Sequence, residues 1–262
     1  MRFNMKRLLI PLLFALPLAL PAEVSVKTLA YPIGKDKAVG EGLLALDGAK
    51  AGKRPGILVV HAWMGIDEHV QEVIRRLAAD GYVAFAADIY GKGVRPADPK
   101  EAGAQAGKYK ADRALLRERV NAGLAQLKAD ARVDAKKIVA IGYCFGGTTV
   151  LELARSGADL AGVVSFHGGL DSPAPADGKN IKAKVLVLHG ADDPAVKAED
   201  LAAFQRELRE AKVDWQQVSY GGAVHAFTQK SANRPGMALY DASADRRSWA
   251  HFKGFLAECF QP

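Results

Sequence analysis

Short hydrophobic runs alternate along the chain with segments in which apolar residues recur every three or four positions. The runs have the near-continuous pattern of strands covered on both faces, and they fall at 56–60, 82–87, 138–141, 160–166, 184–188 and 214–220. The periodic segments predict helices at about 68–80, 112–130, 148–155, 198–211 and 241–258. Strands that alternate with helices indicate a parallel sheet with helices on both faces.

Two regions depart from this alternation. Residues 24–31 alternate between polar and apolar positions, and 42–46 have the composition of a hairpin partner. We therefore expect two antiparallel strands at the N-terminal edge of the sheet. Residues 94–110 are rich in Pro, Ala and Gly, and they predict a long connection after a strand end, on the rim of a pocket.

The first 22 residues have the order of a secretory signal peptide: a basic start, an apolar middle from Leu8 to Leu20, and small residues ending at Ala22. A retained membrane anchor is the alternative, but the apolar run is short, and residues 8–22 contain three prolines. We expect a signal peptide at 1–22, one domain at 23–262, and a periplasmic or secreted protein with no membrane span after cleavage.

Composition narrows the class of partner. The chain has 262 residues, 49% of them apolar, which can bury one sizeable core. Without residues 1–22 it has 33 basic and 29 acidic residues, a formal charge of +4. Lys and Arg alternate with Glu and Asp on the predicted helices, so no basic stripe for nucleic acid is formed. We expect a monomer that acts on a small molecule.

The most informative stretch is 137–150, where a buried strand leads into a glycine-rich turn and then a helix. The pattern Gly142-x-Cys144-x-Gly146 matches the nucleophile elbow G-x-S-x-G with Cys in place of Ser. Two alternatives are a close-packing turn with an inert thiol and a disulfide to Cys259, but Cys259 lies in an apolar segment typical of a packed side chain. We interpret Cys144 as a nucleophile.

Asp193 and His225 follow the next strands along the chain, at strand ends that meet at one edge of a parallel sheet. The order nucleophile, acid, histidine is that of the α/β-hydrolase fold. His225 would accept the thiol proton, and Asp193 would fix the histidine tautomer. Alternatively, Asp193 caps a helix, Asp192 is the acid, or His225 is an ordinary loop residue.

The backbone supplies the remaining part of such a site. The N–H groups of Phe145, which follows the nucleophile, and of Trp63, in the loop after the 57–60 strand, would form an oxyanion hole. Other histidines also follow strands, at 61, 167 and 189, but their spacing matches no metal motif. The glycines do not form G-x-G-x-x-G, so we expect neither a metal nor a cofactor.

Together these segments resemble the dienelactone hydrolase family over about residues 24–258. The matching stretches are 59–66, 80–83, 87–91, 142–147, 189–193 and 225–227. The resemblance implies an α/β-hydrolase three-layer sandwich with a mostly parallel central sheet and an antiparallel N-terminal edge. It also implies a carboxylic ester hydrolase of the carboxymethylenebutenolidase type, which cleaves esters or lactones through a Cys144–His225–Asp193 triad and a thioester acyl-enzyme.

The sequence departs from the family's best-known lactonases at two positions. Ala62 stands where they have a Glu that helps to deprotonate the cysteine, and Gln229 stands where they have an Arg that holds the substrate carboxylate. Lys108, Lys110 or Arg113 could replace a second family Arg. The hydrolytic residues therefore carry over, while specificity for dienelactone does not. The alternative is a non-catalytic or weakly catalytic envelope binding protein on the same fold.

Overall fold

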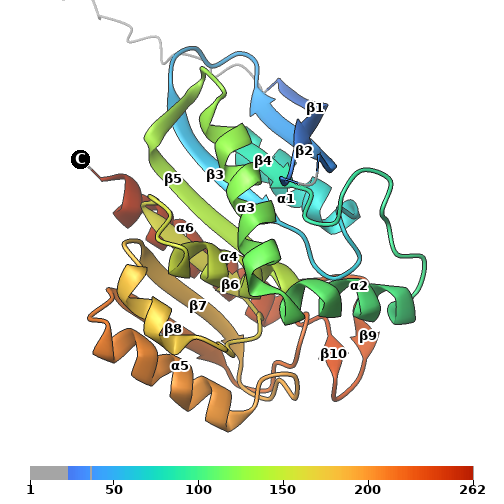
Figure 1. Ribbon diagram of the computed structural model, residues 1–262, viewed down its shortest axis with the longest axis vertical. Coiled ribbons are helices and arrows are strands. Elements are labelled where there is room, and N and C mark those ends of the chain that lie inside the picture. Colours follow the sequence, from blue (N-terminus) through green and yellow to red (C-terminus); the bar gives the residue numbers. More distant parts are fainter. Residues whose placement is uncertain (1–22, 36, 262) are drawn as a thin grey trace, which may run out of the picture.

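The computed structural model describes residues 23–35 and 37–261, so the predicted signal peptide lies outside the described residues. A central sheet of eight strands, in the order β1-β2-β4-β3-β5-β6-β7-β8, lies between two layers of helices (Figure 1). Its strands are β1 (Val24–Pro32), β2 (Val39–Asp47), β3 (Arg54–Val60), β4 (Val83–Ala87), β5 (Val133–Tyr143), β6 (Gly162–Phe166), β7 (Lys184–Gly190) and β8 (Trp215–Tyr220). This confirms the predicted three-layer α/β-hydrolase architecture.

The N-terminal edge of the sheet is antiparallel, as the alternation at 24–31 predicted. Strand β1 pairs antiparallel with β2, and β2 pairs antiparallel with β4. From β4 to β8 every neighbouring pair is parallel. The carboxyl ends of these parallel strands therefore lie along one edge of the sheet, where α/β proteins bind their ligands.

Helices cover both faces of the sheet, and the sheet divides the apolar core in two (Figure 1). They are α1 (Glu68–Ala79), α2 (Pro99–Ala111), α3 (Arg113–Lys128), α4 (Phe145–Arg155), α5 (Ala198–Glu210) and α6 (Ala242–Phe260), with a short 3₁₀ helix η1 at Pro175–Asn180. Apolar side chains of α1 and α6 pack on one face, and those of α3, α4 and α5 pack on the other. Both faces are covered, which explains why the central strands have near-continuous apolar sequences.

Helix α1 illustrates how local sequence sets the ends of an element. Its N-cap Asp67 accepts a hydrogen bond from the backbone N–H of Val70 at 3.0 Å, a contact that contributes about 1 kcal/mol to helix stability. Its apolar residues at helical spacing are buried against the sheet. The helix ends before Gly81, whose φ of +102° suits glycine.

The prediction of an irregular connection at 94–110 is wrong over most of its length, because Pro99–Ala111 form α2. Asp98 caps this helix by accepting a hydrogen bond from the N–H of Glu101 at 2.8 Å. The helix contains many small residues, two of them glycines. Few large apolar side chains therefore mark its buried face in the sequence. A second element that was not predicted is the hairpin of β9 (Asn233–Arg234) and β10 (Ala238–Leu239).

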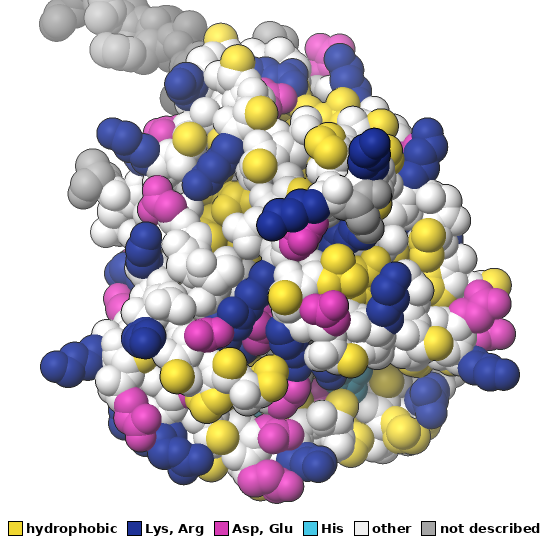
Figure 2. All heavy atoms as spheres, viewed as in Figure 1, with side chains coloured by type: hydrophobic (Ala, Val, Ile, Leu, Met, Phe, Trp, Pro, Cys, Tyr) yellow, Lys and Arg dark blue, Asp and Glu magenta, His cyan; other side chains and the backbone are white. Residues whose placement is uncertain are grey.

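The surface has mixed charge. Figure 2 shows Lys and Arg side chains interspersed with Asp and Glu over the face that it displays. Within the described part of the chain, no helix has the length and apolar character needed to cross a membrane. Cys144 and Cys259 are both free thiols.

Candidate active site

Cys144 lies at a sharp turn between β5 and α4. Its φ of 53° and ψ of −114° are unusual for a residue other than glycine, and strain of this kind is typical of functional sites. Its N–H donates to the carbonyl of Phe166 on β6 at 3.0 Å, which holds the turn against the sheet. A Cβ on Gly142 would collide with the Gly146 carbonyl, and a Cβ on Gly146 would collide with the Val60 carbonyl. Both glycines are therefore required by close backbone contacts.

The loops after β7 and β8 bring Asp193 and His225 together. Nδ1–H of His225 donates to Oδ2 of Asp193 at 2.8 Å, and Oδ1 of Asp193 accepts the backbone N–H of Ala195 at 2.8 Å. The Asp193 side chain is fully buried, whereas Asp192 is exposed. Because a carboxylate only accepts hydrogen bonds, the Nδ1 nitrogen carries a proton and Nε2 is left for the thiol.

The thiol of Cys144 and the imidazole of His225 shift each other's pKa in opposite directions. Burial acts to raise the pKa of Cys144, but the charge of His225, a hydrogen bond with its ring and the N–H of Phe145 lower it overall. Burial acts to lower the pKa of His225, but attraction to Cys144 and the hydrogen bond to Asp193 raise it to about 10. These shifts favour a thiolate beside an imidazolium.

The loop after β3 presents the backbone N–H of Trp63 to the same rim. That N–H has no acceptor among residues 23–35 and 37–261. The peptide is held firmly, because Tyr90 Oη donates to the Trp63 carbonyl at 2.9 Å. His61 also supports the loop: its Nδ1 pairs with the Ala62 carbonyl at 2.7 Å, and its Nε2 accepts the N–H of Ile89 at 3.2 Å.

Sequence reasoning named the backbone groups of Trp63 and Phe145 but missed the supporting roles of His61 and Tyr90. Burial lowers the pKa of His61, in agreement with a neutral ring whose Nε2 accepts a hydrogen bond. The available signal was position alone, since His61 follows β3 and Tyr90 follows β4. Their partners depend on how two loops meet, and sequence spacing does not specify this.

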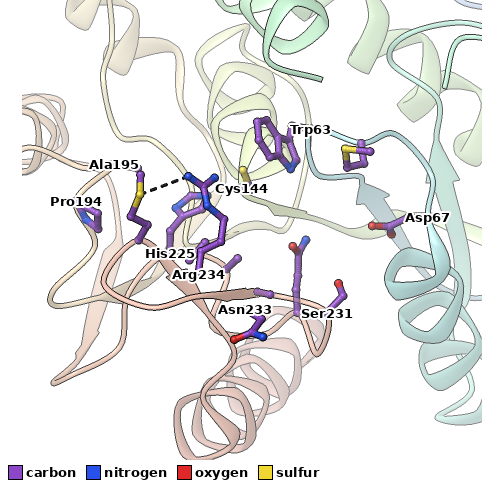
Figure 3. A pocket seen from close by; sticks show the side chains of 15 residues that line it. Trp63, Asp67, Cys144, Pro194, Ala195, His225, Ser231, Asn233 and Arg234 are labelled. Atoms are coloured by element: carbon purple, nitrogen blue, oxygen red, sulfur yellow. Dashed lines mark hydrogen bonds between the residues drawn. The ribbon is translucent and has the colours of Figure 1, made fainter. Parts of the chain in front are cut away.

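Two cavities adjoin Cys144. The larger has a volume of about 520 Å³ and the smaller about 170 Å³, and both are bordered by Trp63, Cys144, Ala195 and His225. Figure 3 shows the larger one, in which the Arg234 guanidinium donates to the Met237 sulfur at 3.4 Å. The thiol is therefore accessible from two spaces of different size.

The structure also places the positions at which the sequence departs from the best-known lactonases. Ala62 is buried in the core, and Gln229 lines the larger cavity. Of the three candidate cations on 108–113, only Lys110 borders a cavity at Cys144. Lys108 lies over the ring of Tyr109, and Arg113 pairs with Asp171 at 2.6 Å.

Two other histidines lie at strand ends, His167 directly after β6 and His189 near the end of β7. His167 is buried, its Nε2 pairs with Thr228 Oγ1 at 2.8 Å, and its ring centroid lies 5.3 Å from that of His225. Burial lowers the pKa of His167 well below the usual value and also lowers that of His189. Within the described ranges, no group of three or more His, Cys, Asp or Glu side chains is arranged to hold a metal ion.

Comparison with known proteins gives consistent matches. Residues 41–260 match the model of the dienelactone hydrolase family. Two solved structures, "m3DLH" and the dienelactone hydrolase-like promiscuous phosphotriesterase P91 from metagenomic libraries, are each 40% identical to this chain. Each covers 91% of this chain and 99% of its own, with TM-scores of 0.86 and 0.85. A Salmonella typhimurium protein named "Putative carboxymethylenebutenolidase" is 28% identical over 234 residues, 80% of this chain and 79% of that protein.

Proposed function

The chain belongs to the dienelactone hydrolase family and is a hydrolase of lactones or esters, and we propose that it works through a catalytic triad of Cys144, His225 and Asp193. The observation that carries this proposal is the pairing of the His225 ring with buried Asp193 at 2.8 Å, beside a thiol whose pKa is lowered. In this proposal His225 lowers the pKa of the thiol and takes the part that the Glu at position 62 has in the best-known lactonases.

In the first half of the proposed reaction, the Cys144 thiolate attacks the carbonyl carbon of the substrate. The new C–S bond pushes an electron pair onto the carbonyl oxygen, which the N–H groups of Phe145 and Trp63 stabilise. When this pair returns, the C–O bond to the alcohol part breaks. The departing oxygen takes the proton of His225 Nε2, and a thioester remains on Cys144.

In the second half, neutral His225 removes a proton from a water molecule as the water oxygen attacks the thioester carbon. The C–S bond then breaks, the acid product leaves, and the thiolate–imidazolium pair is restored. Asp193 holds the ring in place and stabilises the imidazolium in both halves. With a lactone, the alcohol and acid groups remain in a single opened product.

The direct test is Cys144→Ala, assayed on 4-nitrophenyl acetate. We expect kcat/KM to fall by at least about 10³-fold, because the substitution removes the group that forms the acyl-enzyme. Cys259→Ala is the matched control: burial raises the pKa of this thiol to about 12, and the residue packs near α6's C-terminal end, so activity should stay unchanged. Unchanged activity in Cys144→Ala would contradict the proposed mechanism.

We propose a second activity from the similarity to P91, which is described as a promiscuous phosphotriesterase. The thiolate would attack phosphorus as it attacks a carbonyl carbon, the two N–H donors would stabilise the phosphoryl oxygen, and the aryloxide group would leave. Paraoxon is a suitable probe, and Cys144→Ala should abolish its hydrolysis together with that of the ester. If the wild-type protein hydrolyses only the ester, the phosphotriesterase activity is rejected and the ester mechanism stands.

We also propose that the protein is exported to the periplasm or secreted. The support is the basic, apolar and small-residue order of residues 1–22. Expression of the full chain with its signal segment should give a mature protein whose first residue is near Glu23. Recovery of an intact N-terminus from the cytoplasmic fraction would count against export.

A further inference from the structure

We propose that the two cavities at Cys144 separate the two halves of an ester, with a short acyl group in the smaller cavity and a bulky, mainly apolar alcohol group in the larger. This inference rests on the proposed cysteine mechanism and names its substrate class. The four residues Trp63, Cys144, Ala195 and His225 border both cavities. A carbonyl carbon in contact with the thiol therefore lies at the junction, and its two substituents point into different spaces.

The smaller cavity sets the limit on the acyl group. Its volume of about 170 Å³ corresponds to about five or six water-sized groups. Its other walls come from α2, α4 and the loop after β6: Ala106, Lys110, Phe145, Thr148 and Gly169. Thr148 Oγ1 donates to the Gly169 carbonyl at 3.0 Å, and Ala106 and Phe145 are buried, so these parts of the wall are held in place, whereas Lys110 is exposed. The space has little capacity to expand on the side of Ala106 and Phe145.

The larger cavity has the opposite properties. At about 520 Å³ it lies within the usual size range of small-molecule sites. Met64 and Met237 both line it, and methionine side chains adapt to ligands of different shape. Figure 3 shows side chains of the 231–234 segment along its border with Trp63 opposite. Bulky apolar groups of varied shape therefore fit here.

The order of product release favours placing the alcohol group in the larger cavity. The alcohol leaves first, while the acyl group stays bound to Cys144 until water attacks it. The larger cavity is bordered by exposed residues, among them Arg234 and Met237, and Met237 is 53% exposed. The alcohol can depart past these residues. The acyl group then remains beside buried Ala106 and Phe145, and the vacated larger cavity admits water to His225.

The inference predicts two independent size dependences for the wild-type enzyme. In a series of 4-nitrophenyl esters, kcat/KM should be highest for acyl chains of two to about six carbons and fall by about tenfold or more at decanoate. In a series of acetate esters, bulky aromatic alcohols such as 1-naphthol should be accepted as well as phenol. A steady rise of activity with acyl length would overturn the proposal.

The decisive variants narrow one cavity at a time. Ala106→Leu narrows the smaller cavity and should lower kcat/KM for hexanoate relative to acetate by about tenfold or more. Ala232→Leu narrows the larger cavity. It should lower the activity on 1-naphthyl acetate relative to phenyl acetate, with no change in acyl-length preference. Ala104→Leu is the matched control on α2, because Ala104 is exposed and borders neither cavity at Cys144.

The outcomes separate this inference from the cysteine mechanism. If Ala106→Leu and Ala232→Leu both act on the same half of the ester, the assignment of halves to cavities is wrong although Cys144→Ala is still inactive. If Cys144→Ala keeps its activity, the mechanism fails whatever the size dependence. Ala106→Val provides a smaller change at the same site if the Leu variant has a lowered melting temperature, and it should give the same selectivity in weaker form.

Discussion

Asp192 and Asp193 are adjacent in the chain, but only Asp193 faces His225. Its buried carboxylate fixes the histidine through one oxygen and its own loop through the other. Asp193→Asn should lower kcat by about 10²- to 10⁴-fold, because an amide does not hold the required tautomer or stabilise the imidazolium. Asp192→Asn is the matched control and should leave kcat unchanged, since Asp192 is exposed. Equal effects of the two substitutions on 4-nitrophenyl ester hydrolysis would contradict the assignment.

The shifted pKa values of Cys144 and His225 predict a broad range of active pH. A lowered thiol pKa leaves a larger fraction of Cys144 ionised than of a free cysteine at the same pH, so iodoacetamide should alkylate it faster at pH 6 to 7. At the other limit, kcat/KM should fall as the pH rises through about 10, where the His225 imidazolium loses its proton.

His225→Ala provides the matched measurement for this pH dependence. The substitution removes the main group that lowers the Cys144 pKa, so the midpoint of alkylation should move to higher pH. Cys259 serves as an internal slow-reacting thiol, because burial raises its pKa to about 12. A Cys144 thiol that is inert at all these pH values would instead favour a binding protein without catalysis.

At the scale of elements, the sequence was most informative where burial was complete. The apolar run before Gly142 predicted β5, and strand ends in a parallel sheet predicted that the 193 and 225 loops would meet. Helix α2 was missed because two of its three buried residues are alanines: Ala102, Ala106 and Tyr109 face the core. The β9–β10 hairpin has two-residue strands and a bridge from Ala238 to His225, which depend on tertiary contacts.

The cap of α2 gives a prediction at this scale. Asp98 accepts the N–H of Glu101 at 2.8 Å, and Glu101 in turn accepts the N–H of Ala97 at 2.9 Å. Asp98→Ala should lower the free energy of unfolding by about 0.5–2 kcal/mol, measured by urea denaturation. Asp98→Asn keeps a capping oxygen and should cost much less. Equal losses in the two variants would show that charge or packing, rather than the capping bond, is responsible.

At the scale of the whole molecule, a buried network of charged side chains joins three helices. Arg155 on α4 contacts Glu207 on α5 through two hydrogen bonds of 2.8 Å, and it also donates to Glu152 at 3.0 Å. Arg117 on α3 pairs with Glu152 at 2.8 Å. Arg117, Arg155 and Glu207 are far apart in the sequence, and all four residues look like ordinary surface charges on periodic helices. Their burial follows from how the helices pack, so hydrophobic patterning could not predict it.

This network predicts an unusual contrast in stability. The side chains of Arg155 and Glu207 are each only 1% exposed, so Glu207→Ala leaves a buried guanidinium without its main partner and should lower the free energy of unfolding by about 3–5 kcal/mol. Replacing both residues, as Arg155→Met with Glu207→Leu, removes the charges together and should cost less than Glu207→Ala alone. Lys253→Met breaks the exposed pair with Asp80 and should cost about 0–1 kcal/mol. Urea denaturation of the three variants measures the contrast, and a double variant less stable than Glu207→Ala would show that packing of the two long side chains outweighs their charge.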